Sequence, residues 1–210
     1  MTLAPDEPYA LKDLVEQRRR AAMLSLPHMR PLTEYLERIR RVQGPGYDMP
    51  NFDPCDGGVN ARALFLLEAP GRKAVGSSFI SCNNPDQTAR NMNEVLRAAE
   101  LNRRDVLLWN IVPWYVGDGN RIRPVTSADV AEAAPYLGEL IQLLPKLRVV
   151  VLVGKKAQSA RATVQRLTRV PILETHHPSP QVFNITPHRR AEVQATFEEA
   201  RRVLERGATL

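Results

Sequence analysis

The sequence predicts an α/β fold of three layers, α/β/α, with a central four-stranded parallel sheet and additional helices at the N-terminus. Two observations carry this prediction. Four short apolar runs have the length of strands: 63–67, 106–109, 149–153 and 170–173. They alternate with stretches that have helical spacing of apolar residues. Continuous apolar strands separated by helices are typical of a parallel sheet that is covered on both faces.

Two amphipathic helices are predicted before the first strand, over residues 10–24 and 31–42. Their apolar residues recur at helical spacing on a charged background. Pro31 suits the start of the second helix. A loop rich in Gly and Pro, 44–58, then leads to the sheet. The apolar positions are Leu11, Leu14, Val15 and Met23 in the first helix, and Leu32, Tyr35, Leu36 and Ile39 in the second.

Four more helices are predicted at 86–101, 127–144, 155–167 and 187–205. For the last of these, Thr186 is the expected N-cap, because its hydroxyl can accept from the first free amides. The chain has 210 residues, with no internal repeat, and this length suits one well-buried domain. We expect a helical extension and loop over residues 1–60 and an α/β core over 61–205.

Composition narrows the classes of function. The net charge of +6 favours a polyanionic partner such as DNA, but only weakly. The two cysteines, Cys55 and Cys82, cannot build a four-thiolate iron–sulfur or zinc site, so we interpret them as free thiols and expect no metal or cofactor. The sequence shows neither a membrane-length apolar run nor a signal-peptide pattern, and a cytoplasmic protein is expected.

The most informative segment is His176-His177-Pro178-Ser179-Pro180, directly after the fourth apolar run. Two prolines stiffen the backbone there. His177 is therefore held at the carboxyl end of a strand, where open α/β sheets bind their ligands. A histidine in this position can donate a hydrogen bond to developing negative charge. The simpler alternative is a rigid turn with surface histidines.

The other three predicted strands also end in unusual sequences. Glu68-Ala69-Pro70-Gly71 follows the first, Asn110 begins the sequence after the second, and Gly154-Lys155-Lys156 follows the third. In a parallel sheet these ends fall on one edge, so together with His177 they predict a single site.

Each of these residues also has a structural interpretation. Glu68 could be a solvated charge, Asn110 could bond to its own backbone, and the two lysines could lie on a solvated helix start. Phe79 could anchor the core beneath its loop, or it could stack on a planar ligand.

These segments resemble the uracil-DNA glycosylase superfamily over roughly residues 65–184. Glu68-Ala69-Pro70-Gly71 is similar to the first motif of the thermophile-type branch, and His177-Pro178-Ser179-Pro180 matches the second motif. The resemblance implies that Asn110 binds the edge of uracil, that Phe79 stacks on it, and that His177 stabilises the leaving base. It also implies that Ala69, Pro70 and Gly71 line the base pocket.

The resemblance further implies a DNA-binding surface, which comprises Gly154, Lys155, Lys156, Ser179, Gln181 and Phe183. Several positions depart from the family pattern. Ala69 replaces the usual acidic or amide residue that positions water, which leaves Glu68 as the candidate. Gly71 replaces the tyrosine that excludes thymine. Gln181 replaces the leucine that wedges into DNA, so that Phe183 is the apolar candidate.

The sequence therefore predicts a monomeric DNA-repair glycosylase that flips uracil out of DNA, hydrolyses its N-glycosidic bond and leaves an abasic site. Three alternatives remain open at this point. They are a uracil- or abasic-site-binding protein with little turnover, a glycosylase for another deaminated base, and a nucleotide- or anion-binding enzyme unrelated to DNA.

Overall fold

The computed structural model describes residues 6–117, 121–184 and 187–206. Four parallel strands form the central sheet in the order β4-β2-β5-β6. The strands are β2 (Ala63–Leu67), β4 (Val106–Asn110), β5 (Val149–Val153) and β6 (Ile172–Thr175). Their carboxyl ends are in register, with Leu67 opposite Asn110 and Val153 opposite Thr175. This alignment confirms the predicted parallel sheet and places the four following segments at one edge.

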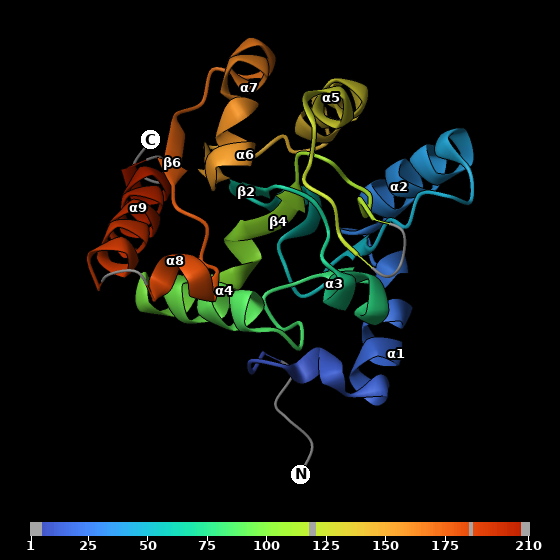
Figure 1. Ribbon diagram of the computed structural model, residues 1–210, viewed down its shortest axis with the longest axis horizontal. Coiled ribbons are helices and arrows are strands. Elements are labelled where there is room, and N and C mark those ends of the chain that lie inside the picture. Colours follow the sequence, from blue (N-terminus) through green and yellow to red (C-terminus); the bar gives the residue numbers. More distant parts are fainter. Residues whose placement is uncertain (1–5, 118–120, 185–186, 207–210) are drawn as a thin grey trace.

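Helices cover both faces of the sheet, as predicted. α4 (Gln87–Ala98) and α9 (Pro187–Arg206) lie on one side, and α5 (Ser127–Gln142), α6 (Lys155–Ser159) and α7 (Arg161–Leu167) lie on the other (Figure 1). The rings of Phe65 in β2 and Phe197 in α9 are 4.7 Å apart. β4 and β5 are buried along their whole length, because neighbouring strands and helices enclose them.

The second N-terminal helix, α2 (Arg30–Gln43), lies where the sequence predicts it. Its residues Leu32, Leu36 and Ile39 are buried in the main core. Tyr35 is also buried, and its hydroxyl donates a hydrogen bond of 2.9 Å to the carbonyl of Tyr136 in α5. The extension is therefore packed against the α/β core.

The first predicted helix differs from the structure in its extent and its buried face. Residues 10–12 form a separate short turn, and α1 (Leu14–Ala22) begins after Asp13, whose carboxylate accepts from the amide of Val15. Leu14 and Val15 are 63% and 67% exposed, which contradicts the predicted apolar face. The buried residue of this helix is Arg20.

Arg20 is buried because it belongs to an ion network. Its guanidinium pairs with the buried carboxylate of Asp53, which also pairs with Arg103. Arg103 in turn donates to Asp56 at 2.8 Å. Burying one of these charged groups without a partner would cost roughly several kcal/mol, so the burial of each group depends on its ion pairs.

Four smaller differences follow from tertiary packing. The predicted helix at 155–167 is broken at Ala160 into α6 and α7, and β6 begins two residues later than predicted. The loop at 44–58 contains β1 (Asn51–Phe52), which pairs in parallel with β3 (Phe79–Ile80). Two short helices, α3 (Arg72–Ser77) and α8 (Pro180–Phe183), have no counterpart in the prediction. The predicted N-cap Thr186 and residues 1–5 lie outside the described residues.

Candidate active site

A cavity of about 600 Å³ lies at the carboxyl edge of the sheet. Glu68, Asn110 and His177 all line it, although they lie at the carboxyl ends of three different strands. The structure thus brings together the three residues that the sequence analysis proposes as catalytic. Ala69, Pro70 and Gly71, proposed to contact the base, also line the cavity.

His177 is fixed in place by Gly154. Gly154 has a φ of +91°, a backbone conformation that favours glycine. Its amide donates a hydrogen bond of 2.8 Å to the carbonyl oxygen of Thr175. A Cβ on Gly154 would lie 3.0 Å from the Cβ of His177. The glycine therefore lets β5 approach the histidine closely, and it acts through His177 because it does not itself line the cavity.

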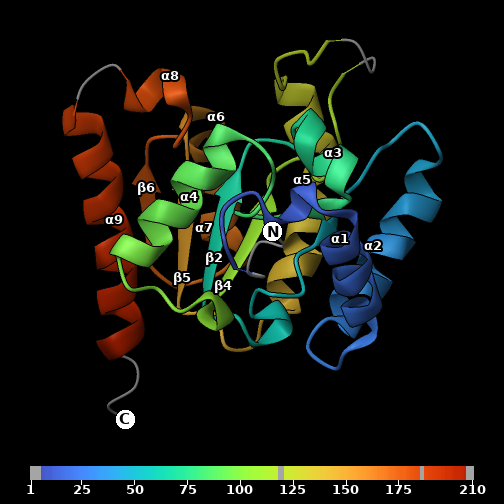
Figure 2. The same cartoon turned by 90° about the horizontal axis from the view of Figure 1, so that it is seen from below.

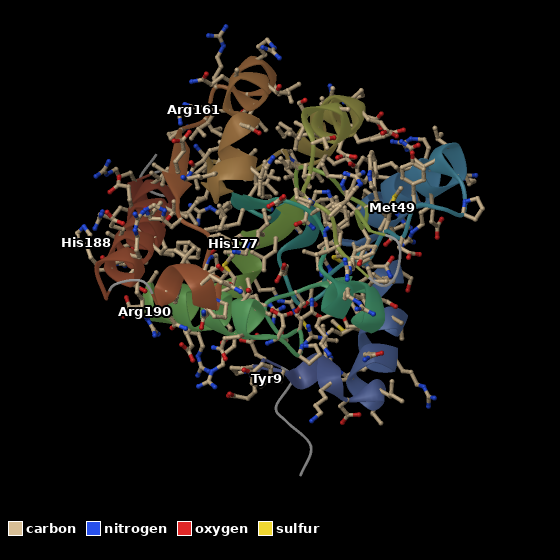
Figure 3. All side chains as sticks on the ribbon, in the orientation of Figure 1. Tyr9, Met49, Arg161, His177, His188 and Arg190 are labelled. Atoms are coloured by element: carbon tan, nitrogen blue, oxygen red, sulfur yellow. The ribbon has the colours of Figure 1, made fainter. Side chains whose placement is uncertain are left out.

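The imidazole of His177 is mostly enclosed, and Figure 3 shows it near the centre of the molecule, far from His188 on the outer edge. Burial lowers the pKa of His177, and the nearby charge of Asp86 opposes this shift. His177 is consequently neutral at neutral pH, with one ring N–H available to donate. Its neighbour His176 instead contacts Glu192 of α9 at 3.0 Å.

Asn110 is the last residue of β4, and only 4% of it is exposed. Its Nδ2 has no hydrogen-bond partner among the residues that the structure describes. Buried amide groups are normally paired, since an unpaired donor costs roughly 1–3 kcal/mol. An unsatisfied donor on the wall of a cavity is therefore a reason to expect a ligand that accepts from it.

Glu68 is half-buried, and its Oε1 accepts from the amide of Val125 at 3.3 Å. Lys156 donates to the carbonyl of the same residue at 2.7 Å. Lys156, predicted to contact DNA, is thus engaged with the backbone of the loop before α5. Among the described residues, the second carboxylate oxygen of Glu68 makes no hydrogen bond or ion pair.

Phe79 does not occupy the position that stacking on a ligand would require. It lies in β3, is 1% exposed and is absent from the cavity wall. Its neighbour Ile80 lines the cavity instead. The pairing of β3 with β1 turns Phe79 into the interior, which agrees with the alternative interpretation as a core anchor.

The residues proposed for DNA binding lie at the starts of two short helices, α6 and α8. Ser179 is the N-cap residue of α8, and both Lys155 and Gln181 are exposed. Phe183 is only partly exposed and packs against the core. The guanidinium carbon of Arg190 lies over its ring, 5.6 Å from the ring centroid. This packing argues against the prediction that Phe183 wedges into DNA.

Some residues of the cavity are absent from the sequence prediction. Asp86 lines it and caps α4, where its carboxylate accepts from the amide of Ala89 at 2.9 Å. The Asn-Pro-Asp sequence before α4 could have indicated such a cap. The other residues that the prediction lacks include the exposed or charged Arg72, Lys73, Ile122 and Arg123. They lie in α3 and in the loop before α5, for which no sequence pattern was recognised.

The branch that the first motif resembles usually carries an iron–sulfur cluster held by four cysteines, and the residues of this chain do not fit one. It has two cysteines, and both thiols lie in the field of Arg103 within the buried ion network. Burial raises the pKa of Cys82 to about 12, so this cavity residue remains a protonated thiol. No cluster of three metal-ligating side chains occurs among the described residues.

The fold and cavity define an α/β protein with a histidine, an amide and a carboxylate gathered at the carboxyl edge of a parallel sheet. The model of the uracil DNA glycosylase superfamily matches residues 54–201. This match spans well over half of the chain, so the protein belongs to the uracil DNA glycosylase superfamily, as the sequence motifs indicate. Among the described residues, the helices are too short or too polar to cross a membrane.

Two further comparisons add little. A solution structure from Methanosarcina acetivorans, provisionally assigned as a uracil DNA glycosylase, is similar at 17% identity and a TM-score of 0.45. The similarity covers 67% of this chain and 91% of that one. A search of curated proteins found no match.

Proposed function

We propose that this protein is a monofunctional uracil-DNA glycosylase, which hydrolyses the bond between uracil and deoxyribose and leaves an abasic site. The observation that carries the proposal is the meeting of His177 and the unpaired Nδ2 of Asn110 in one cavity. Membership of the superfamily supports the same reaction class.

Asn110 supplies the recognition of the base. Uracil presents an acceptor, O4, beside a donor, N3–H, and an amide side chain can match both. Cytosine presents the reverse pattern at this edge. A flipped uracil would accept a hydrogen bond from the buried Nδ2 of Asn110, whereas cytosine would leave this donor unpaired. The free-energy cost of the unpaired donor would therefore favour uracil over cytosine.

His177 supplies stabilisation of the leaving group. As the bond between C1′ and N1 breaks, its electron pair passes to uracil and negative charge gathers on O2. A neutral imidazole can donate its N–H to this oxygen and remain uncharged while it does so. One preorganised donor of this kind is worth roughly 3–4 kcal/mol in the transition state.

Glu68 is the candidate for orienting the attacking water. The described cavity wall contains two carboxylates, Glu68 and Asp86. The carboxylate of Asp86 caps α4, whereas one oxygen of Glu68 makes no hydrogen bond or ion pair with the described residues. The oxygen of the water forms the new bond to C1′. The proton that the water loses passes to Glu68 or to solvent. No metal or cofactor enters this scheme.

DNA is the proposed partner, and a monomer suffices for the scheme. The net charge of +6 favours binding to phosphates, Lys155 and Gln181 are exposed, and Ser179 is half-buried at the start of α8. The side chain of Lys156 donates to Val125, so it contributes charge at the edge of this surface.

The test is a single-turnover assay for uracil release from a labelled single-stranded oligonucleotide. We expect abasic sites with uracil and none with cytosine. The Asn110→Asp variant should lose activity on uracil and gain release of cytosine, because a carboxylate offers only acceptors. Tight binding to uracil-DNA without abasic product would overturn the proposal in favour of a binding protein.

A further inference from the structure

One exposed apolar side chain lies on the rim of the cavity. Ile122 is 54% exposed and lines the cavity. Within the described part of the chain, the other exposed large apolar residues are Leu14, Val15, Leu26, Val42 and Leu167. None of these five belongs to the cavity wall. An exposed apolar residue is ordinary by itself, but its position beside a ligand cavity requires an explanation.

The backbone holds Ile122 firmly. Gly117 and Ile122 form an antiparallel bridge, and the amide of Arg123 donates 2.9 Å to the carbonyl of the buried Val116. A Cβ on Gly117 would lie 2.5 Å from the carbonyl oxygen of Arg121, so the close approach of the two strands needs glycine. Ile122 is thus presented by a paired segment.

The segment after Ile122 is anchored to the catalytic edge. Arg123 donates to both carboxylate oxygens of Asp129, at 2.7 and 2.6 Å. Asp129 also forms a reciprocal cap with Thr126 at the start of α5. Val125 contacts Glu68 and Lys156 as described above. The position of Ile122 is therefore fixed relative to Glu68.

The surroundings of Ile122 match a nucleic acid. Arg72 and Lys73 line the same cavity, whereas the guanidinium of the neighbouring Arg123 is paired with Asp129. Cationic side chains around a single exposed apolar side chain suit a ligand that has phosphates outside and flat apolar faces inside. Figure 2 shows the loop that joins β4 to α5 at the same end of the molecule as α8.

We propose that Ile122 is the residue that enters the base stack of duplex DNA when a base is flipped into the cavity. This inference rests on the proposed function. α8 offers the polar Gln181 on its surface, and its Phe183 is packed under Arg190. The apolar group that fills the space left in the base stack by the flipped base is thus supplied by the loop between β4 and α5.

The experiment compares uracil release from a duplex and from the same oligonucleotide as a single strand, under single-turnover conditions. A single strand needs no wedge, because its bases are already partly unstacked. Ile122→Ala should lower the ratio of duplex rate to single-strand rate about tenfold, because the apolar side chain that offsets part of the unstacking cost is removed. Ile122→Leu should restore most of the ratio. Val42→Ala is the matched control, because Val42 is exposed on α2 away from the cavity.

A second measurement reports the flipping step directly. A 2-aminopurine placed next to uracil in the duplex should brighten when the wild-type protein binds, and should brighten less with Ile122→Ala. Equal losses on both substrates would show that Ile122 only forms part of the pocket wall, and would overturn the inference while the proposed function stands. Failure of the wild-type protein to release uracil from either substrate would instead overturn the proposed function and the inference with it.

Discussion

The side-chain amide of Asn91 donates a hydrogen bond of 2.8 Å to the carbonyl oxygen of Pro178. The two residues are 87 positions apart, and both are buried. Asn91 is itself oriented by Gln87, whose amide donates 2.8 Å to its Oδ1. This contact ties the turn that carries His177 to α4, the helix that Asp86 caps at the cavity.

Replacement of Asn91 by Ala should loosen that turn. The carbonyl of Pro178 would lose its partner in a buried setting, at a cost of roughly 1–3 kcal/mol in the free energy of unfolding. The single-turnover rate should fall as well, because the backbone that positions His177 is released. Denaturant titration and uracil-release assays measure the two effects. Arg90→Ala, at an exposed position of the same helix, is the control, since it leaves Asn91, Gln87 and the bond to Pro178 in place; equal losses in both variants would contradict a specific role for this bond.

The two adjacent histidines should respond very differently to substitution. His177→Ala removes the donor to the leaving base and should slow the chemical step roughly 100–1,000-fold. His176→Ala removes contacts to Glu192 and Arg189 on α9, and should change the rate only a few-fold. Single-turnover rates at saturating enzyme measure both, and comparable rates would mean that the wrong histidine has been assigned.

The lowered pKa of His177 predicts the direction of pH dependence. Between its folded-state pKa and 6.5, the unfolded chain binds more protons at this site than the folded chain does. The contribution of His177 to stability is therefore fully present above pH 6.5 and is lost as the pH falls through the folded pKa. We expect the acid limb due to His177 in the rate profile to lie below pH 6.5, and this limb should vanish in His177→Ala. A limb above pH 6.5 that disappears in this variant would be inconsistent with a buried neutral imidazole.

Glu68→Gln separates two roles for this carboxylate. If Glu68 orients or deprotonates the water, the rate should drop roughly 100–10,000-fold with little change in affinity for uracil-DNA. If it serves only to accept from the amide of Val125, the glutamine oxygen can take that bond and the rate should remain within a few-fold of the wild type. We expect the larger loss. Single-turnover rates together with binding titrations distinguish the two results.

The buried ion network should dominate the stability of the N-terminal segment. Arg20→Met leaves the carboxylate of Asp53 buried with one guanidinium fewer, and should lower the free energy of unfolding by roughly 3–5 kcal/mol. Arg18→Met, on the exposed side of the same helix, is the control and should change it by less than about 0.5 kcal/mol. A similar midpoint of denaturation for both variants would refute this role.

The sheet could be predicted because its strands leave a strong local signal. Runs such as 149–153 are wholly apolar, and the structure has β5 at these residues. The positions of Asn110 and His177 followed from this sheet, since each comes at or just after the end of a strand. The gathering of these two residues in one cavity is thus a consequence of local pattern and parallel topology.

The remaining features depend on contacts between segments that are distant in sequence. Arg20 has the pattern of a solvated residue, and only the pairing with Asp53 and Arg103 explains its burial. Phe79 stands in a polar loop, and its orientation is set by the pairing of β3 with β1. Ile122 stands out only when the cavity beside it is known, because single apolar residues are common in loops.

The order β4-β2-β5-β6 also governs when the site can exist during folding. Glu68 and Asn110 become neighbours as soon as β2 and β4 pair, but His177 arrives only when β6 has docked on β5. Parallel strands close over long connections and form slowly. A chain in which β6 is not docked on β5 therefore lacks His177 at the cavity, even where β2 and β4 have already brought Glu68 and Asn110 together.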